Sequence, residues 1–159
     1  MTVPFRATTF PGMVLTGDDS SSQVRLLLDK IEEKSVGRRV WIVDPGINSS
    51  SFLRDHAGSS DEVIYSNVSR EPSTDYVDFL VRQISTGQGA TPKSIVGIGG
   101  GITLDIAKAL SVCLTSNNRS ADLQGWDRVR EPGIPKLGIP TVAGTGVESS
   151  RTAVVINSD

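Results

Sequence analysis

The feature that most constrains the fold of this chain is a run of glycines at residues 99–101. An apolar run at 95–98 leads directly into the glycines, and a helical pattern at 102–115 follows them. A short, continuous apolar run is typical of a strand buried on both faces, as in a parallel sheet. The segment therefore predicts a buried strand, a tight turn and a helix, which is one unit of an α/β protein.

Strand and helix patterns alternate along the rest of the chain, which argues for a mainly parallel sheet covered on both faces. The predicted strands lie at 40–43, 63–65, 95–98, 137–139 and 154–156. Helical patterns cover 24–31, 47–56, 76–84 and 102–115. Two further short strands, at 5–9 and 14–16, flank a Pro-Gly turn signal and predict a β-hairpin before the sheet. With 159 residues, the chain fits a single domain.

Charge and composition exclude several classes of partner. The chain has 16 Lys and Arg against 18 Asp and Glu, so a net charge of -2 offers no field for nucleic acid or an anionic membrane. No apolar stretch approaches the roughly 20 residues that span a bilayer, and the N-terminus lacks a signal-peptide pattern. A single cysteine, Cys113, excludes an internal disulfide, and a single histidine, His56, excludes a His-rich metal site. We expect a cytoplasmic protein, with Cys113 in the core and His56 solvated.

The glycine run also predicts a phosphate site. Glycine lets an anion approach the backbone N–H groups because no Cβ intervenes, and the start of a helix favours phosphate. A tight turn without a ligand would need only one glycine. The G-x-G-x-x-G fingerprint does not fit, because Ile102 or Leu104 falls where its last glycine should be, and the Walker A sequence is absent. We therefore expect a phosphate cradle for a nucleotide of unspecified type.

A second loop of small and hydroxyl residues follows the predicted strand at 137–139. It reads PTVAGTGVESS and contains Thr141 and Thr145, whose hydroxyls can donate hydrogen bonds to a ligand. Taken alone, the loop is interpreted as a polar, glycine-rich connection.

Together, GGGITLDIAK and GIPTVAGTGVESSRTAVV resemble the nucleotide-binding half of the iron-containing alcohol dehydrogenases, a family related to the dehydroquinate synthases. Members of that family carry GGGSxxDxAK and PTTAGTGSE-like loops. The resemblance covers essentially the whole chain and implies a Rossmann-like sheet, with residues 1–159 as an NAD(P)-binding domain. It also implies reversible oxidation of an alcohol to an aldehyde or ketone, with hydride passing to NAD or NADP.

The resemblance assigns these residues to the cofactor: Asp44, Gly99, Gly100, Gly101, Asp105, Thr141 and Thr145. The glycines would hold the pyrophosphate, Asp105 would lie beside the cofactor, and the threonines would line it further along. Asp44 would accept hydrogen bonds from the ribose and repel a 2′-phosphate, which favours NAD over NADP. An Asx turn is the alternative interpretation of Asp44. Ile102 and Val142 replace a serine and a threonine of the family, so only the backbone contacts there should survive.

In the family, the metal ligands, an Asp and several His, come from a helical C-terminal domain. This sequence stops at Asp159, before such a domain, so we expect an incomplete nucleotide-binding domain without catalytic or metal-binding residues. NAD is the expected cofactor, NADP its alternative, and iron or zinc would bind only through the absent domain. The expected partner is a small alcohol or carbonyl substrate. An exposed sheet face would favour weak self-association into a homo-oligomer.

Several interpretations stay open. The chain is alternatively a nucleotide-binding module without catalysis, or part of a dehydroquinate-synthase-like cyclase, although PTVAGTGVE favours the dehydrogenases. Lys108 stands one turn after Asp105, where a structural ion pair and a catalytic role are equally compatible with the spacing. Trp126 in a polar loop indicates a ligand or protein contact, and this loop and Glu148 resemble family branches that act on sugar acids.

Overall fold

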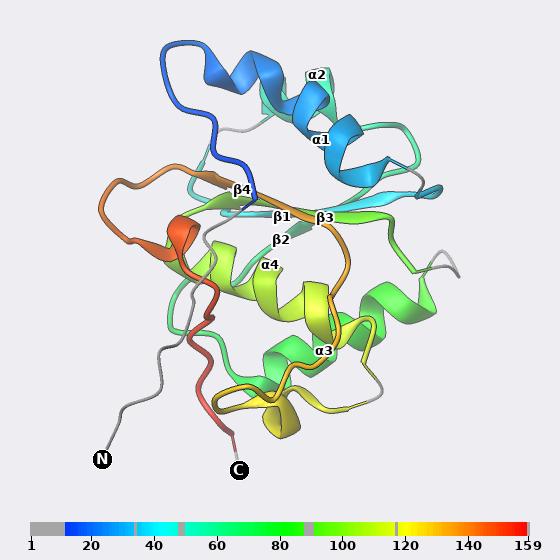
Figure 1. Cartoon of the computed structure of the whole chain (residues 1–159), viewed down its shortest axis with the longest axis vertical. Helices are drawn as coiled ribbons and strands as arrows, with labels where there is room; N and C mark the ends of the chain where they lie inside the picture. Colours follow the sequence, from blue (N-terminus) through cyan, green and yellow to red (C-terminus); the bar gives the residue numbers. More distant parts are fainter. Residues whose placement is uncertain (1–11, 34, 48–49, 88–90, 117, 159) are drawn as a thin grey trace, which may run out of the picture.

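A computed structural model describes residues 12–33, 35–47, 50–87, 91–116 and 118–158 of the chain. Its centre is a parallel sheet in the order β2-β1-β3-β4 (Figure 1). The strands are β1 (Arg39–Val43), β2 (Glu62–Tyr65), β3 (Ser94–Gly99) and β4 (Lys136–Pro140). The predicted parallel α/β architecture is therefore confirmed.

Helices cover both faces of this sheet. They are α1 (Val24–Glu32), α2 (Ser50–His56), α3 (Thr74–Thr86) and α4 (Gly101–Cys113). Short 3₁₀ turns lie at η1 (Ser20–Gln23), η2 (Ser120–Leu123) and η3 (Val147–Ser149). As Figure 1 shows, α1 and α2 lie on one face, and α3 and α4 lie on the other. The chain therefore forms three layers, helix on sheet on helix.

The alternating side chains of β1 join the two halves of the core. Val40 and Ile42 pack in the cluster that contains residues of α3 and α4. Trp41 and Val43 pack in the opposite cluster with residues of α1 and α2. All four are fully buried, because a central parallel strand faces helices on both sides.

Two predicted strands are wrong, and the strand predicted at 63–65 lies at an edge of the sheet. Residues 14–16 form no strand, which removes the second arm of the predicted hairpin, and the first arm at 5–9 lies outside the described residues. Residues 154–156 make only one bridge, between Ser73 and Ile156, in place of a strand. Strand β2 exists but stands at the edge of the sheet, so Tyr65 is 57% exposed. An apolar run fixes neither the pairing partner nor the place of a strand in its sheet.

The amino end of the sheet, where the strands begin, is closed by ion pairs. Glu32 accepts hydrogen bonds from Nε and Nη2 of Arg39 at 2.7 and 2.9 Å, and Nζ of Lys93 lies 3.0 Å from its Oε2. Asp61 accepts from the indole Nε1 of Trp41 at 3.1 Å and from the backbone N of Arg39 at 2.9 Å. Burial raises the pKa of Glu32, but hydrogen bonds from Arg39, Ser94 and Lys93 bring it below its ordinary value.

Candidate functional site

Asp44 and the glycine run, among the predicted cofactor residues, meet at the carboxyl end of the sheet, between β1 and β3. These neighbouring strands continue into helices on opposite faces, α2 after β1 and α4 after β3. Such a switch point opens a crevice in which α/β proteins bind ligands. Asp44 follows β1, and its backbone N donates to the carbonyl of Ile98 at 2.9 Å. The turn from β1 therefore lies directly beside the glycine run that ends β3.

The glycines of this run serve different needs. A Cβ on Gly99 would stand 2.7 Å from Oγ1 of Thr103 and 3.0 Å from Cβ of Asp44, so internal packing requires glycine there. At Gly100 the nearest atom, Cγ2 of Val142, would be at an ordinary contact of 3.6 Å. We predicted that all these glycines make room for a ligand, but packing within the chain explains Gly99 and leaves Gly100 open for a ligand.

Helix α4 begins at this point and supplies backbone donors. Gly100 is its N-cap and contributes no side-chain hydrogen bond. The first helical bond runs from N of Leu104 to O of Gly100 at 3.1 Å. The N–H groups of the first turn need acceptors from outside the helix, and the helix dipole favours an anionic one. The start of α4 is therefore suited to a phosphate group.

The loop after β4 lies against the glycine run from the other side. The backbone N of Thr141 donates to O of Gly99 at 3.0 Å. A Cβ on Gly101 would stand 3.4 Å from Val147 and 3.8 Å from Thr145, so the far part of the loop also lies against the glycine run. The Thr145 hydroxyl donates to Glu148 at 2.9 Å. The structure thus brings both predicted threonines into the neighbourhood of the cradle.

Asp44 forms the Asx turn that we considered as its alternative role. Its Oδ1 accepts from the backbone N of Gly46 at 2.8 Å, which fixes the carboxylate at the tip of β1. The turn and a ribose contact are compatible, because a carboxylate accepts several hydrogen bonds. The predicted contact between Asp44 and the ribose stays a prediction.

Asp105 and Lys108 tie α4 to a segment far along the chain. Asp105 is 3% exposed, and its carboxylate accepts from the backbone N of Val154 at 3.0 Å and lies 3.5 Å from Nζ of Lys108. Nζ also donates to O of Val147 at 2.6 Å and to O of Thr152 at 2.8 Å. Burial lowers the pKa of Lys108, while Asp105 opposes that shift. The predicted ion pair is confirmed, and the predicted place of Asp105 beside the cofactor stays a prediction.

Sequence reasoning missed the reach of Lys108. Its acceptors lie in the segment from η3 to Thr152, about forty residues further along the chain. The only local signal was the i,i+3 spacing with Asp105. That spacing indicates an ion pair, but it does not say which distant carbonyl groups the lysine binds.

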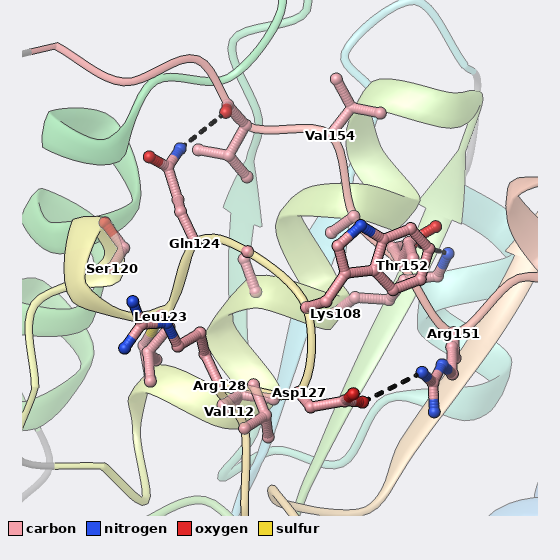
Figure 2. A pocket seen from close by; sticks show the side chains of 17 residues that line it. Lys108, Val112, Ser120, Leu123, Gln124, Asp127, Arg128, Arg151, Thr152 and Val154 are labelled. Carbon is pink, nitrogen blue, oxygen red and sulfur yellow. Dashed lines mark hydrogen bonds and ion pairs between the residues drawn. The ribbon is translucent and has the colours of Figure 1, made fainter. Parts of the chain in front are cut away.

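A cavity of about 580 Å³ lies along α4, beside the loop that contains Trp126 (Figure 2). Gln124 closes one side by donating to O of Val155 at 2.9 Å. An ion pair of 3.3 Å between Arg151 and Asp127 crosses the opposite side (Figure 2). Trp126 is 74% exposed, and its contact with a ligand or a protein stays a prediction.

The described residues bring no group of three or more His, Cys, Asp or Glu into a metal-binding arrangement. They therefore do not fit the iron or zinc that the resemblance implies, and no catalytic step is assigned through a metal. Cys113 is buried, as predicted, and burial raises the pKa of its thiol to about 11. The prediction that His56 is solvated is only partly right. The centre of its ring lies 4.4 Å from that of Phe52, and its Nδ1 is buried without a hydrogen bond.

Among the helices of the described ranges, none combines the length and the apolar character needed to cross a membrane.

Comparison with known proteins establishes the family. The family described as "Iron-containing alcohol dehydrogenase" matches residues 11–159, so the chain belongs to the iron-containing alcohol dehydrogenases, which are oxidoreductases. It is 40% identical over 65 residues to the NAD-dependent methanol dehydrogenase of Bacillus methanolicus, covering 41% of this chain and 17% of that protein. It is 30% identical over 128 residues to the sulfoacetaldehyde reductase of Bilophila wadsworthia, covering 77% of this chain and 32% of that protein.

A solved structure supports the fold. The crystal structure of sulfoacetaldehyde reductase from Bifidobacterium kashiwanohense in complex with NAD+ superposes with a TM-score of 0.73 and 19% identity. The match covers 89% of this chain and 37% of that chain. The chain thus spans less than two fifths of the length of each of these proteins.

Proposed function

We propose that this chain is the NAD-binding part of an alcohol dehydrogenase, and that NAD lies across the carboxyl end of the sheet. The observation that carries the proposal is Gly100, an open glycine at the N-cap of α4 between the loops that follow β1 and β4. A pyrophosphate placed there would receive hydrogen bonds from the first turn of α4. A relative named as NAD-dependent and a structural neighbour solved with NAD+ support the choice of cofactor.

The remaining site residues take the roles that their positions allow. Asp44 would accept hydrogen bonds from the adenosine ribose and so favour NAD over NADP. Thr141 and Thr145 would border the cofactor on the side of β4. When bound, NAD supplies the hydride acceptor for oxidation of a small alcohol, and its reduced form supplies the donor for the carbonyl. The chain's own contribution is to bind and orient the cofactor.

Replacing Gly100 by valine tests this proposal. The bulky side chain would enter the open space at Gly100, so we expect Gly100→Val to lose NAD binding measured by titration calorimetry, with an unchanged circular-dichroism spectrum. Gly58→Val is the matched control, because a Cβ there makes only an ordinary contact of 3.6 Å with Asp61 at the amino end of the sheet. Undiminished NAD binding by Gly100→Val rules the cradle out.

A nucleotide-binding module without catalysis is the second candidate. Incubating the chain with NAD, a panel of small alcohols, and iron or zinc tests whether this chain alone oxidises alcohols. We expect NAD binding without NADH formation from this chain alone, because the described residues offer no ligand set that would hold a metal beside the alcohol oxygen. NADH formation with one metal per chain would overturn this expectation.

A further inference from the structure

A hydrogen-bonded pair of buried hydroxyls lies beneath the proposed phosphate cradle. Ser66, directly after β2, is 2% exposed, and Thr103, in the first turn of α4, is fully buried. Their hydroxyl oxygens are 3.0 Å apart. The Ser66 hydroxyl oxygen is also 3.2 Å from O of Val43, and the Ser66 backbone N donates to the same oxygen at 2.8 Å. The pair therefore connects the ends of β1 and β2 to the start of α4.

The number of protons limits the possible directions of these hydrogen bonds. A serine hydroxyl has one proton to donate. The Ser66 proton goes either to O of Val43 or to the Thr103 hydroxyl, and in the first case Thr103 donates to Ser66. Both hydroxyls are then satisfied in a buried place, where an unpaired one would be costly.

The position of the Thr103 side chain bears directly on the glycine run. A Cβ on Gly99 would be 2.7 Å from both Cβ and Oγ1 of Thr103, so the threonine side chain fills the space beside Gly99. Gly100, the N-cap, is the next residue, and the first turn of α4 follows. Fixing Thr103 therefore fixes the turn whose N–H groups would face the phosphate.

We propose that Ser66 and Thr103 are positioning residues, which hold the first turn of α4 in the orientation that binds the cofactor's pyrophosphate. This inference rests on the proposed function of the cradle. It predicts that loss of the hydroxyl pair weakens the binding of ligands with a phosphate group. The binding of adenosine, whose expected partner is Asp44, should not change. A purely structural pair would change stability without this selectivity.

The test measures dissociation constants for NAD and for adenosine with the full chain. Thr103→Val keeps the shape of the side chain and removes its hydroxyl, so we expect NAD affinity to fall about five- to tenfold, as for the loss of one hydrogen bond. Adenosine affinity should stay within about twofold. Thr103→Ser retains the hydroxyl and should restore most of the NAD affinity. Where Thr103→Val fails to fold, Ser66→Ala removes the same bond with a smaller change in packing.

Ser111→Ala is the matched control. Ser111 lies on α4, is fully buried and donates to O of Ile134 at 2.6 Å, far along the helix from the cradle. We expect it to lower the thermal midpoint and to leave NAD affinity unchanged. The proposal is overturned if Thr103→Val binds NAD as tightly as the wild type, or if NAD and adenosine weaken equally. If the wild-type chain binds neither ligand, the proposed function itself fails, and the positioning role with it.

Discussion

The two ends of the sheet carry similar polar groups but differ in whether those groups find partners within the chain. At the amino end, Glu32 and Asp61 are nearly buried, and Arg39 hydrogen-bonds to both. At the carboxyl end, Asp44 is partly exposed and forms a turn, while the start of α4 has no side-chain cap. Polar groups satisfied within the chain hold the fold together, whereas donors that need an outside acceptor mark a place for a ligand.

The comparison also separates two kinds of buried polar contact. Breaking an ion pair such as Glu32–Arg39 leaves a poorly solvated charge, which strongly destabilises a protein. The hydroxyl pair of Ser66 and Thr103 carries no charge, so its loss costs less. We therefore expect large effects on stability at the amino end and effects on ligand binding at the carboxyl end.

The largest effect should follow from Glu32→Ala. The substitution leaves Arg39 and Lys93 without their shared carboxylate, so the free energy of unfolding should fall by about 3 kcal/mol in urea titrations. NAD affinity of the folded variant should be unchanged, because the site lies at the other end of the sheet. Glu33→Ala, an exposed neighbour, is the control and should change stability by less than about 0.5 kcal/mol. If Glu32→Ala loses NAD affinity without losing stability, the assignment of stability to the amino end and of ligand binding to the carboxyl end is wrong.

Asp44→Asn tests whether the carboxyl end of the sheet selects NAD over NADP through a charge. Asparagine keeps an oxygen to accept from Gly46, so the Asx turn survives and only the charge is lost. If Asp44 binds the ribose, the ratio of NADP to NAD affinity should rise at least about tenfold, since a charged hydrogen bond contributes about 1.5–3 kcal/mol. Binding titrations with both dinucleotides measure the ratio, with the exposed Asp55→Asn as the control. An unchanged ratio would show that Asp44 acts only as a turn residue.

Asp105→Asn decides between two roles for a residue near the site. If Asp105 acts as a tie to Lys108 and Val154, removing its charge should lower the free energy of unfolding by about 1.5–3 kcal/mol, with NAD affinity within about twofold of the wild type. A tenfold weaker affinity at unchanged stability would instead support the place beside the cofactor that the family resemblance implies. Thermal unfolding and calorimetric titration of the same samples give both values.

The smallest effect should be a dependence of stability on acid. The pKa values of Glu32 and Asp61 are lowered in the folded chain from 4.5 and 3.8. A lowered pKa contributes stability above the unfolded value, and that contribution is lost as the pH falls through the folded value. Unfolding midpoints should therefore decrease below about pH 4.5, and less steeply in Glu32→Gln. If the unfolding midpoint falls equally steeply with pH in both proteins, Glu32 does not contribute to the acid dependence.

Much of the fold and the general place of the site could be predicted from local patterns. The run at 95–98 and the glycines after it form β3 and the start of α4, because a buried parallel strand and a glycine turn are both local signals. Asp44 and Gly99 meet because parallel strands end at the same side of a sheet. The failure at 154–156 has a physical cause: a strand exists only where a partner strand is present, and local apolarity does not supply one.

By itself, the sequence determined the alternation of strands and helices, the glycine turn before α4 and the family to which the chain belongs. Only the tertiary structure decided that Gly99 is required for packing while Gly100 stays open. It also decided that Lys108 holds carbonyl groups near Thr152, and that Ser66 meets Thr103 across 37 residues of chain. The physical reason is range: backbone preferences act over a few residues, whereas buried polar groups take whichever partners the folded chain brings within hydrogen-bond distance.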